Sequence, residues 1–267
     1  MLTTVESVAL PTGVTLPYVE QGDPSGLPVI LLHGYSDSWR SFELLLPHLP
    51  DHLRALALTQ RGHGDATRPE AGYRVDDFAS DLAAFMDTLE LPAAVVVGHS
   101  GGTATAQHVA VAHPGRALGL VLIGAAPTFR GNPGVLEVWD AVSELADPVD
   151  PEFVREFQES TVTQPVPDAF LDTIITESRK LPARVWRDAL RGLLEAGVPS
   201  HDGAITAPTL LLWGDRDELC SRGDQEALTA AIAGARLVTY AGTGHAVHWE
   251  QPERDAADLV AFAEGLA

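Results

Sequence analysis

Residues 95–114 read VVVGHSGGTATAQHVAVAHP and decide the fold. An apolar run leads into a helical pattern, and the turn between them holds Ser100 within Gly98-His99-Ser100-Gly101-Gly102. This turn fits G-x-S-x-G, where small residues leave room for a serine in a strained conformation at the start of a helix. Two interpretations are open at this point. Ser100 is a nucleophile, or it merely caps the helix in a glycine-rich turn.

A nucleophilic serine needs a histidine that takes its proton and a carboxylate that orients the histidine. In a strand–turn–helix setting of this kind the chain order is serine, acid, histidine. The segment LLLWGDRDELC places Asp215 and Asp217 just after an apolar run, and YAGTGHAVHWEQPE places His245 after the next one. Open α/β sheets carry their sites past the carboxyl ends of the strands. The order and the positions therefore favour the nucleophile.

Short apolar runs recur along the chain and alternate with helical patterns, which predicts an α/β fold with a parallel sheet covered on both faces. A pair of opening segments, 4–10 and 14–20, predicts an antiparallel hairpin around Pro11-Thr12-Gly13. Helical patterns include 36–49, 75–90, 101–114 and 250–267. The predicted parallel strands are 28–34, 53–58, 93–99, 118–124, 208–215 and 236–242.

No strand-like run occurs between Pro127 and Ala207, an interval too long for a simple connection. Four segments in it have apolar residues at helical spacing, with Pro or Asp at their starts. We therefore expect a core made of residues 1–126 and 208–267, with residues 127–207 forming a helical cap, or lid, inserted into it.

Composition excludes several classes of partner. The net charge is −20, from 37 acidic and 17 basic residues, which disfavours nucleic acid and anionic membranes. No apolar run approaches the ~18 residues of a membrane span, and the first segment has Glu6 where a signal peptide has basic residues, with no long apolar run after it, so we expect a cytoplasmic protein. Cys220 is the single cysteine, and the histidines lack metal-site spacing, so we expect no metal and no organic cofactor. The expected partner is a small-molecule substrate, and the chain is expected to be a monomer or a homodimer.

With these motifs in place the chain resembles the α/β-hydrolase superfamily over essentially its whole length. HGYSDS resembles the family's oxyanion motif, QRGHGDATR its Arg-Gly-x-Gly loop, and GTGHAVHWEQPE its histidine loop. The resemblance implies a mostly parallel, eight-stranded sheet with a helical cap. It also implies that Ser100, Asp217 and His245 form a catalytic triad and that the backbone N–H groups of Tyr35 and Gly101 form the oxyanion hole.

Five further residues are candidates for substrate contact, each with a structural alternative. We expect the ring of His33 to bond within its own loop rather than serve as a second base, and tryptophans in such segments belong more often to a cap core than to a pocket wall. A basic stripe in the last cap segment is interpreted mainly as a solvated face paired with acidic residues, and alternatively as a carboxylate-binding patch. The five candidates are His33, Gly34, His99, Trp139 and Trp186, and the stripe is Lys180, Arg184, Arg187 and Arg191.

The function expected from these residues is a serine hydrolase that cleaves a small, mostly apolar carboxylic ester or lactone through an acyl-enzyme on Ser100. Three alternatives remain within the same family. They are a carbon–carbon bond hydrolase of the meta-cleavage-product type, a cofactor-free perhydrolase, and a signalling protein that senses a ligand. Ala246 follows His245 where the carbon–carbon hydrolases are expected to have an aromatic residue, which lowers the first alternative.

Overall fold

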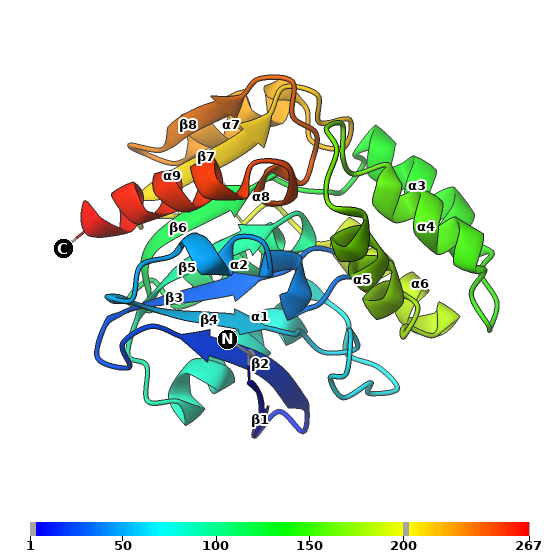
Figure 1. Ribbon diagram of the computed structural model, residues 1–267, viewed down its shortest axis with the longest axis horizontal. Helices are drawn as coiled ribbons and strands as arrows, with labels where there is room; N and C mark the ends of the chain where they lie inside the picture. The colour runs from blue at the N-terminus through cyan, green and yellow to red at the C-terminus, as the bar shows by residue number, and fades with distance from the viewer. Residues whose placement is uncertain (1–3, 200–202, 267) are drawn as a thin grey trace.

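An eight-stranded sheet forms the centre of the computed structural model, which describes residues 4–199 and 203–266 (Figure 1). Its strand order is β1-β2-β4-β3-β5-β6-β7-β8. Strands β1 and β2 pair antiparallel, β2 is antiparallel to β4, and the remaining pairs are parallel. The predicted mostly parallel sheet and its opening hairpin are confirmed. The strands are β1 (Val5–Ala9), β2 (Thr15–Gln21), β3 (Leu27–Leu32), β4 (Leu53–Leu58), β5 (Ala94–His99), β6 (Ala117–Ile123), β7 (Thr209–Gly214) and β8 (Arg236–Tyr240).

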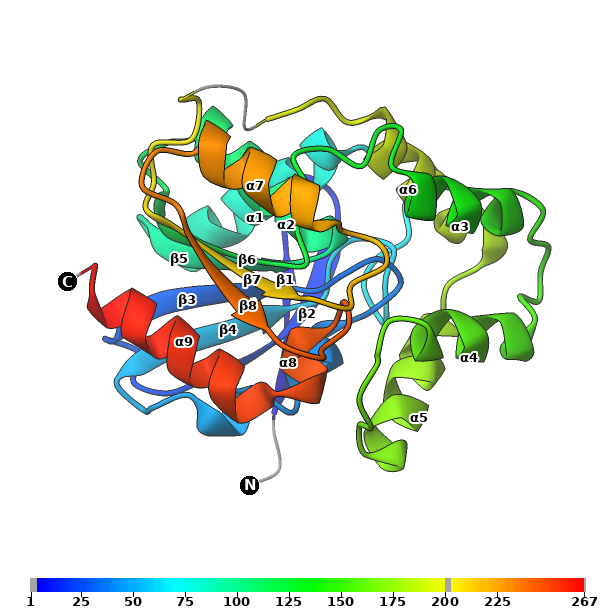
Figure 2. The ribbon, with the colours of Figure 1, turned by 90° about the horizontal axis from the view of Figure 1, so that it is seen from above.

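The central strands lack polar alternation because helices cover both faces of the sheet. Every residue of β5 and of β7 is buried. On one face lie α1 (Val75–Thr88), α2 (Gly101–Ala112) and α7 (Arg222–Ala231), and on the other lie α8 (Val247–Glu250) and α9 (Pro252–Glu264) (Figure 2). None of the helices in the described ranges 4–199 and 203–266 is both long enough and apolar enough to cross a membrane.

The helical pattern predicted over 36–49 forms two 3-10 turns, η1 (Trp39–Phe42) and η2 (Leu46–His48), instead of a continuous α-helix. Its hydrogen bonds span three residues, as in Glu43 N–H to the Arg40 carbonyl. Pro47 lies in the first turn of η2 and has no N–H to continue an α-helical ladder. The expectation of a regular helix here was wrong for this reason.

In the described residues between β6 and β7, four helices stand beyond the carboxyl ends of the parallel strands (Figures 1 and 2). Asn132 and Asp150 cap the first two through their side chains, and a proline opens each of these helices. Within the predicted cap interval 127–207 they pack as two pairs, the first with the last and the middle two together. The helices are α3 (Pro133–Ser143), α4 (Pro151–Glu159), α5 (Asp168–Ser178) and α6 (Ala183–Glu195).

Candidate active site

Ser100 sits on the sharp turn between β5 and α2 with φ 49° and ψ −119°. This is a strained conformation for a residue with a side chain. The residues around it have to be glycines because a side chain there would have no room. A Cβ added at Gly98 would lie 2.5 Å from the Gly102 carbonyl oxygen, and one added at Gly102 would lie 2.4 Å from the Leu32 carbonyl oxygen. The turn therefore has the strain and the close packing that the G-x-S-x-G pattern predicts.

His245 and Asp217 form a tight buried pair. The Nδ1 atom of His245 lies 2.8 Å from Oδ2 of Asp217. The backbone N–H groups of Leu219 and Cys220 both donate to Oδ1 of Asp217, each at 2.8 Å, and so fix the carboxylate. A carboxylate on Nδ1 favours the tautomer with the proton there, which leaves Nε2 free to accept one. Within the described part of the chain no side chain or backbone group bonds to His245 Nε2.

Ser100 and His245 line the same small cavity, which we call the serine cavity. The inserted helices contribute Phe157 to it, and the loop after β7 contributes Leu219. The serine, the histidine and, through the histidine, Asp217 therefore come together from three separate loops at the carboxyl ends of the strands.

The amide cavity lies beside the serine cavity and is lined by His33, Phe78, Gly101 and Leu193, with Gly34 and Tyr35 shared between the two. The backbone nitrogen of Tyr35 is 3.5 Å from the position of a Cβ on Gly101, so these two backbone segments face each other closely. Gly101 is the first residue of α2, where N–H groups have no partner inside the helix and the helix dipole is positive. Two backbone N–H groups are thus available beside Ser100 for a developing negative charge.

His33 is held on both ring nitrogens. Its Nδ1 is 2.7 Å from the Gly34 carbonyl oxygen, and its Nε2 accepts the backbone N–H of Gln60 at 2.9 Å. Burial lowers the pKa of this imidazole well below its usual value, so the ring stays neutral. His33 thus borders the amide cavity as a fixed part of its wall.

His99 lies under the serine cavity, between its neighbour Ser100 and two other histidines. Its ring centroid is 5.0 Å from that of His245 and 4.4 Å from that of His248. Burial lowers the pKa of His99 well below its usual value, and the neighbouring histidines add to the effect. The ring is therefore neutral.

The two predicted tryptophans lie in different places, and neither is among the described residues that line the serine or amide cavity. Trp186 on α6 is fully buried and packs edge-on against the Tyr35 ring at 5.2 Å, while its carbonyl accepts the Tyr35 hydroxyl at 2.7 Å. It therefore supports Tyr35, whose backbone nitrogen lies close to Gly101. Trp139 on α3 lies under Arg191, whose guanidinium carbon is 5.5 Å from the centroid of the Trp139 ring.

All four residues of the basic stripe have a polar partner among the described residues. No lysine or arginine occurs among the described residues that line the serine and amide cavities. The structure thus supports the structural interpretation of the stripe over a carboxylate-binding patch. The contacts are Lys180 with Asp65 at 2.7 Å and Glu177 at 2.8 Å, Arg184 with the carbonyls of Arg68 and Pro69, Arg187 with the carbonyl of Leu145, and Arg191 with Asp188 at 3.6 Å.

Asp217, Cys220 and His245 each bring one potential metal-ligand atom to within 4.8 Å of the others. Two of these atoms already bond to each other in the histidine–aspartate pair. The Cys220 thiol lies 3.2 Å from the Gly124 carbonyl oxygen, and burial raises its pKa well above the usual value. A metal binds the thiolate form, which this environment disfavours. The group fits an acid–base pair better than a metal centre.

Asp37 is a site residue that the sequence reasoning missed. Its buried carboxyl lines the serine cavity, and Oδ2 lies 3.9 Å from Nδ1 of His99. The side-chain amide of Gln158, on α4, donates to Asp37 Oδ1 at 3.1 Å and to Ser36 Oγ at 3.0 Å. Asp37 belongs to the HGYSDS motif, so its position in the sequence could have drawn attention to it. No local pattern marks Gln158.

Comparison with known proteins gives a family match over most of the chain. A family model described as alpha/beta hydrolase fold matches residues 28–252, a span that includes Ser100, Asp217 and His245. The chain is 29% identical to a non-heme chloroperoxidase from Streptomyces lividans, over 97% of this chain and 99% of the relative. It is 30% identical to a non-heme haloperoxidase from Rhodococcus erythropolis, over 94% and 97% of the two chains.

A solved structure with the same fold is an esterase (EaEST) from Exiguobacterium antarcticum, with a TM-score of 0.87 and 23% identity over 98% of this chain and all of the other. This likeness is one of fold and agrees with the eight-stranded sheet. With the family model covering the sheet from β3 to the start of α9, the chain belongs to the alpha/beta hydrolase fold family of hydrolases.

Proposed function

We propose that the protein is a serine hydrolase that cleaves small, mostly apolar carboxylic esters or lactones through an acyl-enzyme on Ser100. One observation carries this proposal. The Nε2 atom of His245 is unpartnered among the described residues, on a ring that shares a cavity with Ser100 and is held from behind by Asp217. A base held in this way serves to take the proton of a serine hydroxyl.

The steps follow from this arrangement. Ser100 Oγ bonds to the carbonyl carbon while its proton passes to His245 Nε2, and the carbonyl oxygen becomes an anion held by the N–H groups of Tyr35 and Gly101. The intermediate collapses, the bond to the alcohol oxygen breaks, and the alcohol leaves with the proton from His245. Water then attacks the acyl-enzyme, gives a proton to His245, and releases the carboxylic acid as Ser100 regains its proton.

The charges at the site favour neutral substrates. The serine cavity contains the carboxyl group of Asp37, and no lysine or arginine lines it or the amide cavity among the described residues. A dioic substrate of the meta-cleavage type would bring a carboxylate into these cavities without a cation to balance it. An uncharged ester or lactone meets no such cost, and this supports ester cleavage over carbon–carbon cleavage.

A second candidate activity is perhydrolysis, which the relatives named as a non-heme chloroperoxidase and a non-heme haloperoxidase favour. Here hydrogen peroxide replaces water in the second step. One peroxide oxygen bonds to the acyl carbon, the bond to Ser100 breaks, and the products are a peracid and the free serine. The same triad serves both reactions, so peracid formation from acetate esters and peroxide is measured alongside hydrolysis.

The test compares the wild-type protein with Ser100→Ala and with Ser80→Ala, a control that removes an exposed hydroxyl on α1. With p-nitrophenyl butyrate, Ser100→Ala should lose at least about 10³-fold in kcat, and Ser80→Ala should keep the wild-type rate. A fluorophosphonate should add its mass to the peptide that holds Ser100 in the wild-type protein. Full activity of Ser100→Ala, or hydrolysis of none of a panel of esters and lactones, overturns the proposal.

A further inference from the structure

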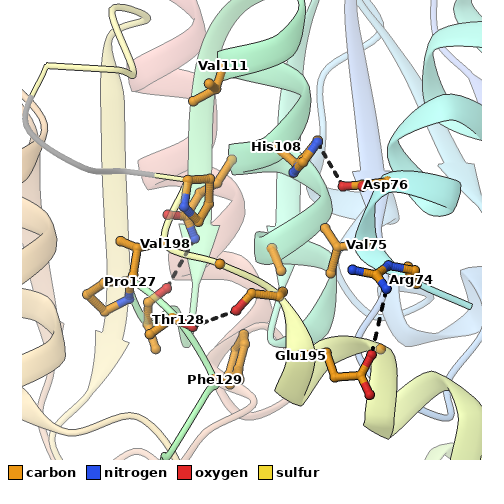
Figure 3. A pocket seen from close by; sticks show the side chains of 17 residues that line it. Arg74, Val75, Asp76, His108, Val111, Pro127, Thr128, Phe129, Glu195 and Val198 are labelled. Atoms are coloured by element: carbon orange, nitrogen blue, oxygen red, sulfur yellow. Dashed lines mark hydrogen bonds and ion pairs between the residues drawn. The ribbon is translucent and has the colours of Figure 1, made fainter.

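A separate cavity of about 330 Å³ lies where the inserted helices join the core (Figure 3). Its walls are α1, α2, the end of α6, and the two connecting segments 127–129 and 196–199. The Thr128 hydroxyl donates to the Ala196 carbonyl oxygen at 3.2 Å and so ties the two connectors together. We call this space the connector cavity. Its volume is in the range of pockets that hold small organic molecules.

The lining of the connector cavity is suited to an uncharged, apolar occupant. Val75, Val111 and Phe129 contribute apolar surface, and Figure 3 shows charged side chains at its edge. The polar side chains here pair with one another: His108 lies 3.1 Å from Asp76, and Arg74 lies 3.9 Å from Glu195. An ionised group on an occupant would have to break these pairs or stay without a partner.

The connector cavity and the amide cavity have one lining residue in common among the described residues. Val75, the first residue of α1, lines both spaces. Along α2, Gly101 and Thr105 face the amide cavity, whereas Ala104 and His108 face the connector cavity. On α6, Leu193 lines the amide cavity and its neighbour Gly192 lines the connector cavity. The two cavities therefore follow one another along the same pair of helices, with Val75 between them.

The chemistry of ester cleavage determines which part of a substrate lies on this side of Ser100. His245 must give its proton to the departing alcohol, so the alcohol has to lie in the serine cavity, which His245 lines. The acyl group occupies another direction at the tetrahedral carbon. The amide cavity is beside Ser100 and is not lined by His245, which leaves it as the space for the acyl group.

We propose that the acyl chain of the substrate passes through the amide cavity, beyond Val75, and into the connector cavity. This inference rests on the proposed function and narrows it to esters of medium-chain, unbranched, uncharged acyl groups. At 1.5 Å per residue along α2, Ala104 is about 6 Å and Val111 about 16 Å from Ser100. A short acyl group ends before Val75, and a longer one reaches the connector cavity.

The experiment measures kcat/KM for p-nitrophenyl acetate and p-nitrophenyl octanoate and takes the ratio of octanoate to acetate. Val75→Ala removes two methyl groups between the cavities and should raise this ratio about tenfold, the scale of one or two methylene groups in an apolar pocket. Val75→Phe narrows the passage and should lower it. Gly197→Phe should also lower it, because Gly197 lines the connector cavity and a Cβ there meets no atom within 4 Å.

The matched control is Val138→Ala, which trims a partly buried valine on α3 that lines neither the amide nor the connector cavity. It should leave the ratio unchanged. Thermal unfolding identifies any variant that fails to fold. If the Val75 variants do not fold, the ratio measured for Gly197→Phe tests the proposal instead. A crystal structure of the adduct with an octyl fluorophosphonate should show the chain in the connector cavity.

Two results separate the failure of this inference from the failure of the proposed function. An unchanged ratio in folded Val75→Ala and Gly197→Phe, or an octyl chain that leaves through the serine cavity, overturns the acyl route while ester hydrolysis stands. Hydrolysis of neither ester by the wild-type protein overturns the proposed function itself.

Discussion

The backbone carbonyl of Thr161 accepts the N–H of His245 at 3.0 Å, so the segment that follows α4 bonds directly to the loop carrying the proposed base. The same carbonyl also accepts the N–H of Ala246 at 3.2 Å. Because α4 lies within the inserted helices, these helices do more than cover the site. Their position and the position of His245 are set together.

Glu250 holds this junction from the other side, and its substitution gives the first prediction. Its carboxylate accepts the backbone N–H groups of Gly244 at 2.9 Å, Thr163 at 2.9 Å and Gln164 at 3.1 Å. Glu250→Gln leaves one acceptor oxygen and places an NH₂ group against these donors. We expect the free energy of unfolding to fall by about 1.5–3 kcal/mol, and kcat to fall more than KM rises, because His245 loses its alignment.

The matched control is Glu253→Gln, an exposed carboxylate in the first turn of α9. It should leave both stability and kcat near the wild-type values. Urea unfolding and initial rates with p-nitrophenyl butyrate provide the two measurements. A Glu250→Gln protein with wild-type kcat would mean that the histidine loop keeps its place without the carboxylate.

Asp217 and its near neighbour Asp215 give a second prediction, since the two aspartates lie in the same loop and have different partners. Asp217 bonds to the His245 ring, whereas Asp215 accepts the Gly242 backbone N–H at 2.6 Å. Asp217→Asn turns an NH₂ group toward His245 Nδ1 and favours the wrong tautomer, so kcat should fall about 10⁴-fold. Asp215→Asn should keep most of the activity. Equal losses in the two variants would remove the assignment of Asp217 as the acid.

The close packing of the serine turn gives a third prediction. A Cβ at Gly98 would lie 2.5 Å from the Gly102 carbonyl oxygen, and backbone atoms cannot yield as a flexible side chain does. Gly98→Ala should therefore lower the free energy of unfolding by about 1–3 kcal/mol or more. Gly115→Ala is the control, because a Cβ there meets nothing within 4 Å. The midpoints of urea unfolding compare the two, and matching midpoints would contradict the steric argument.

The sheet and the order of the proposed triad could be predicted from the sequence because their signals are local. The apolar run 93–99 predicted a strand, and β5 begins at Ala94. The motif predicted that the glycines around Ser100 leave no room for a side chain, and a Cβ added there would clash with backbone atoms. Parallel strands bring loops that follow them to one edge, so the loops after β5, β7 and β8 had to converge there.

The residues of the inserted helices that contact the loops of the site could not be predicted from local sequence patterns. Gln158 is 121 residues from Asp37, and no spacing in either segment indicates that the α4 helix packs on that loop. The same limit applies to the tryptophans. Helical spacing placed Trp139 and Trp186 on amphipathic helices, but tertiary packing decides their partners. Trp139 meets Arg191 where α3 packs on α6, and Trp186 meets Tyr35 where α6 packs on the loop after β3.

Asp37 gives the last prediction, which concerns pH. Burial raises the pKa of this carboxyl from 3.8 to about 7, against the opposing effect of hydrogen bonds from Gln158 and Ser41 and of the nearby His245. Between about pH 4 and pH 7 the folded protein therefore holds a proton that the unfolded chain has released. The state that binds more protons is favoured by acid. The stability from this group is complete below about pH 4 and is lost as the pH rises through 7.

Asp37→Asn keeps the shape of the side chain and removes the ionisation, so it should become more stable relative to the wild-type protein as the pH rises. Between pH 5 and pH 8 the difference in unfolding free energy should shift by about 2–3 kcal/mol in favour of the variant, since each pKa unit corresponds to about 1.4 kcal/mol. Urea unfolding at both pH values measures the shift. Asp51→Asn, which changes an exposed aspartate before β4, should show no such dependence. A parallel response of Asp37→Asn and wild type across this range would mean that Asp37 is ionised throughout, and that its carboxylate is stabilised by the groups around it despite its burial.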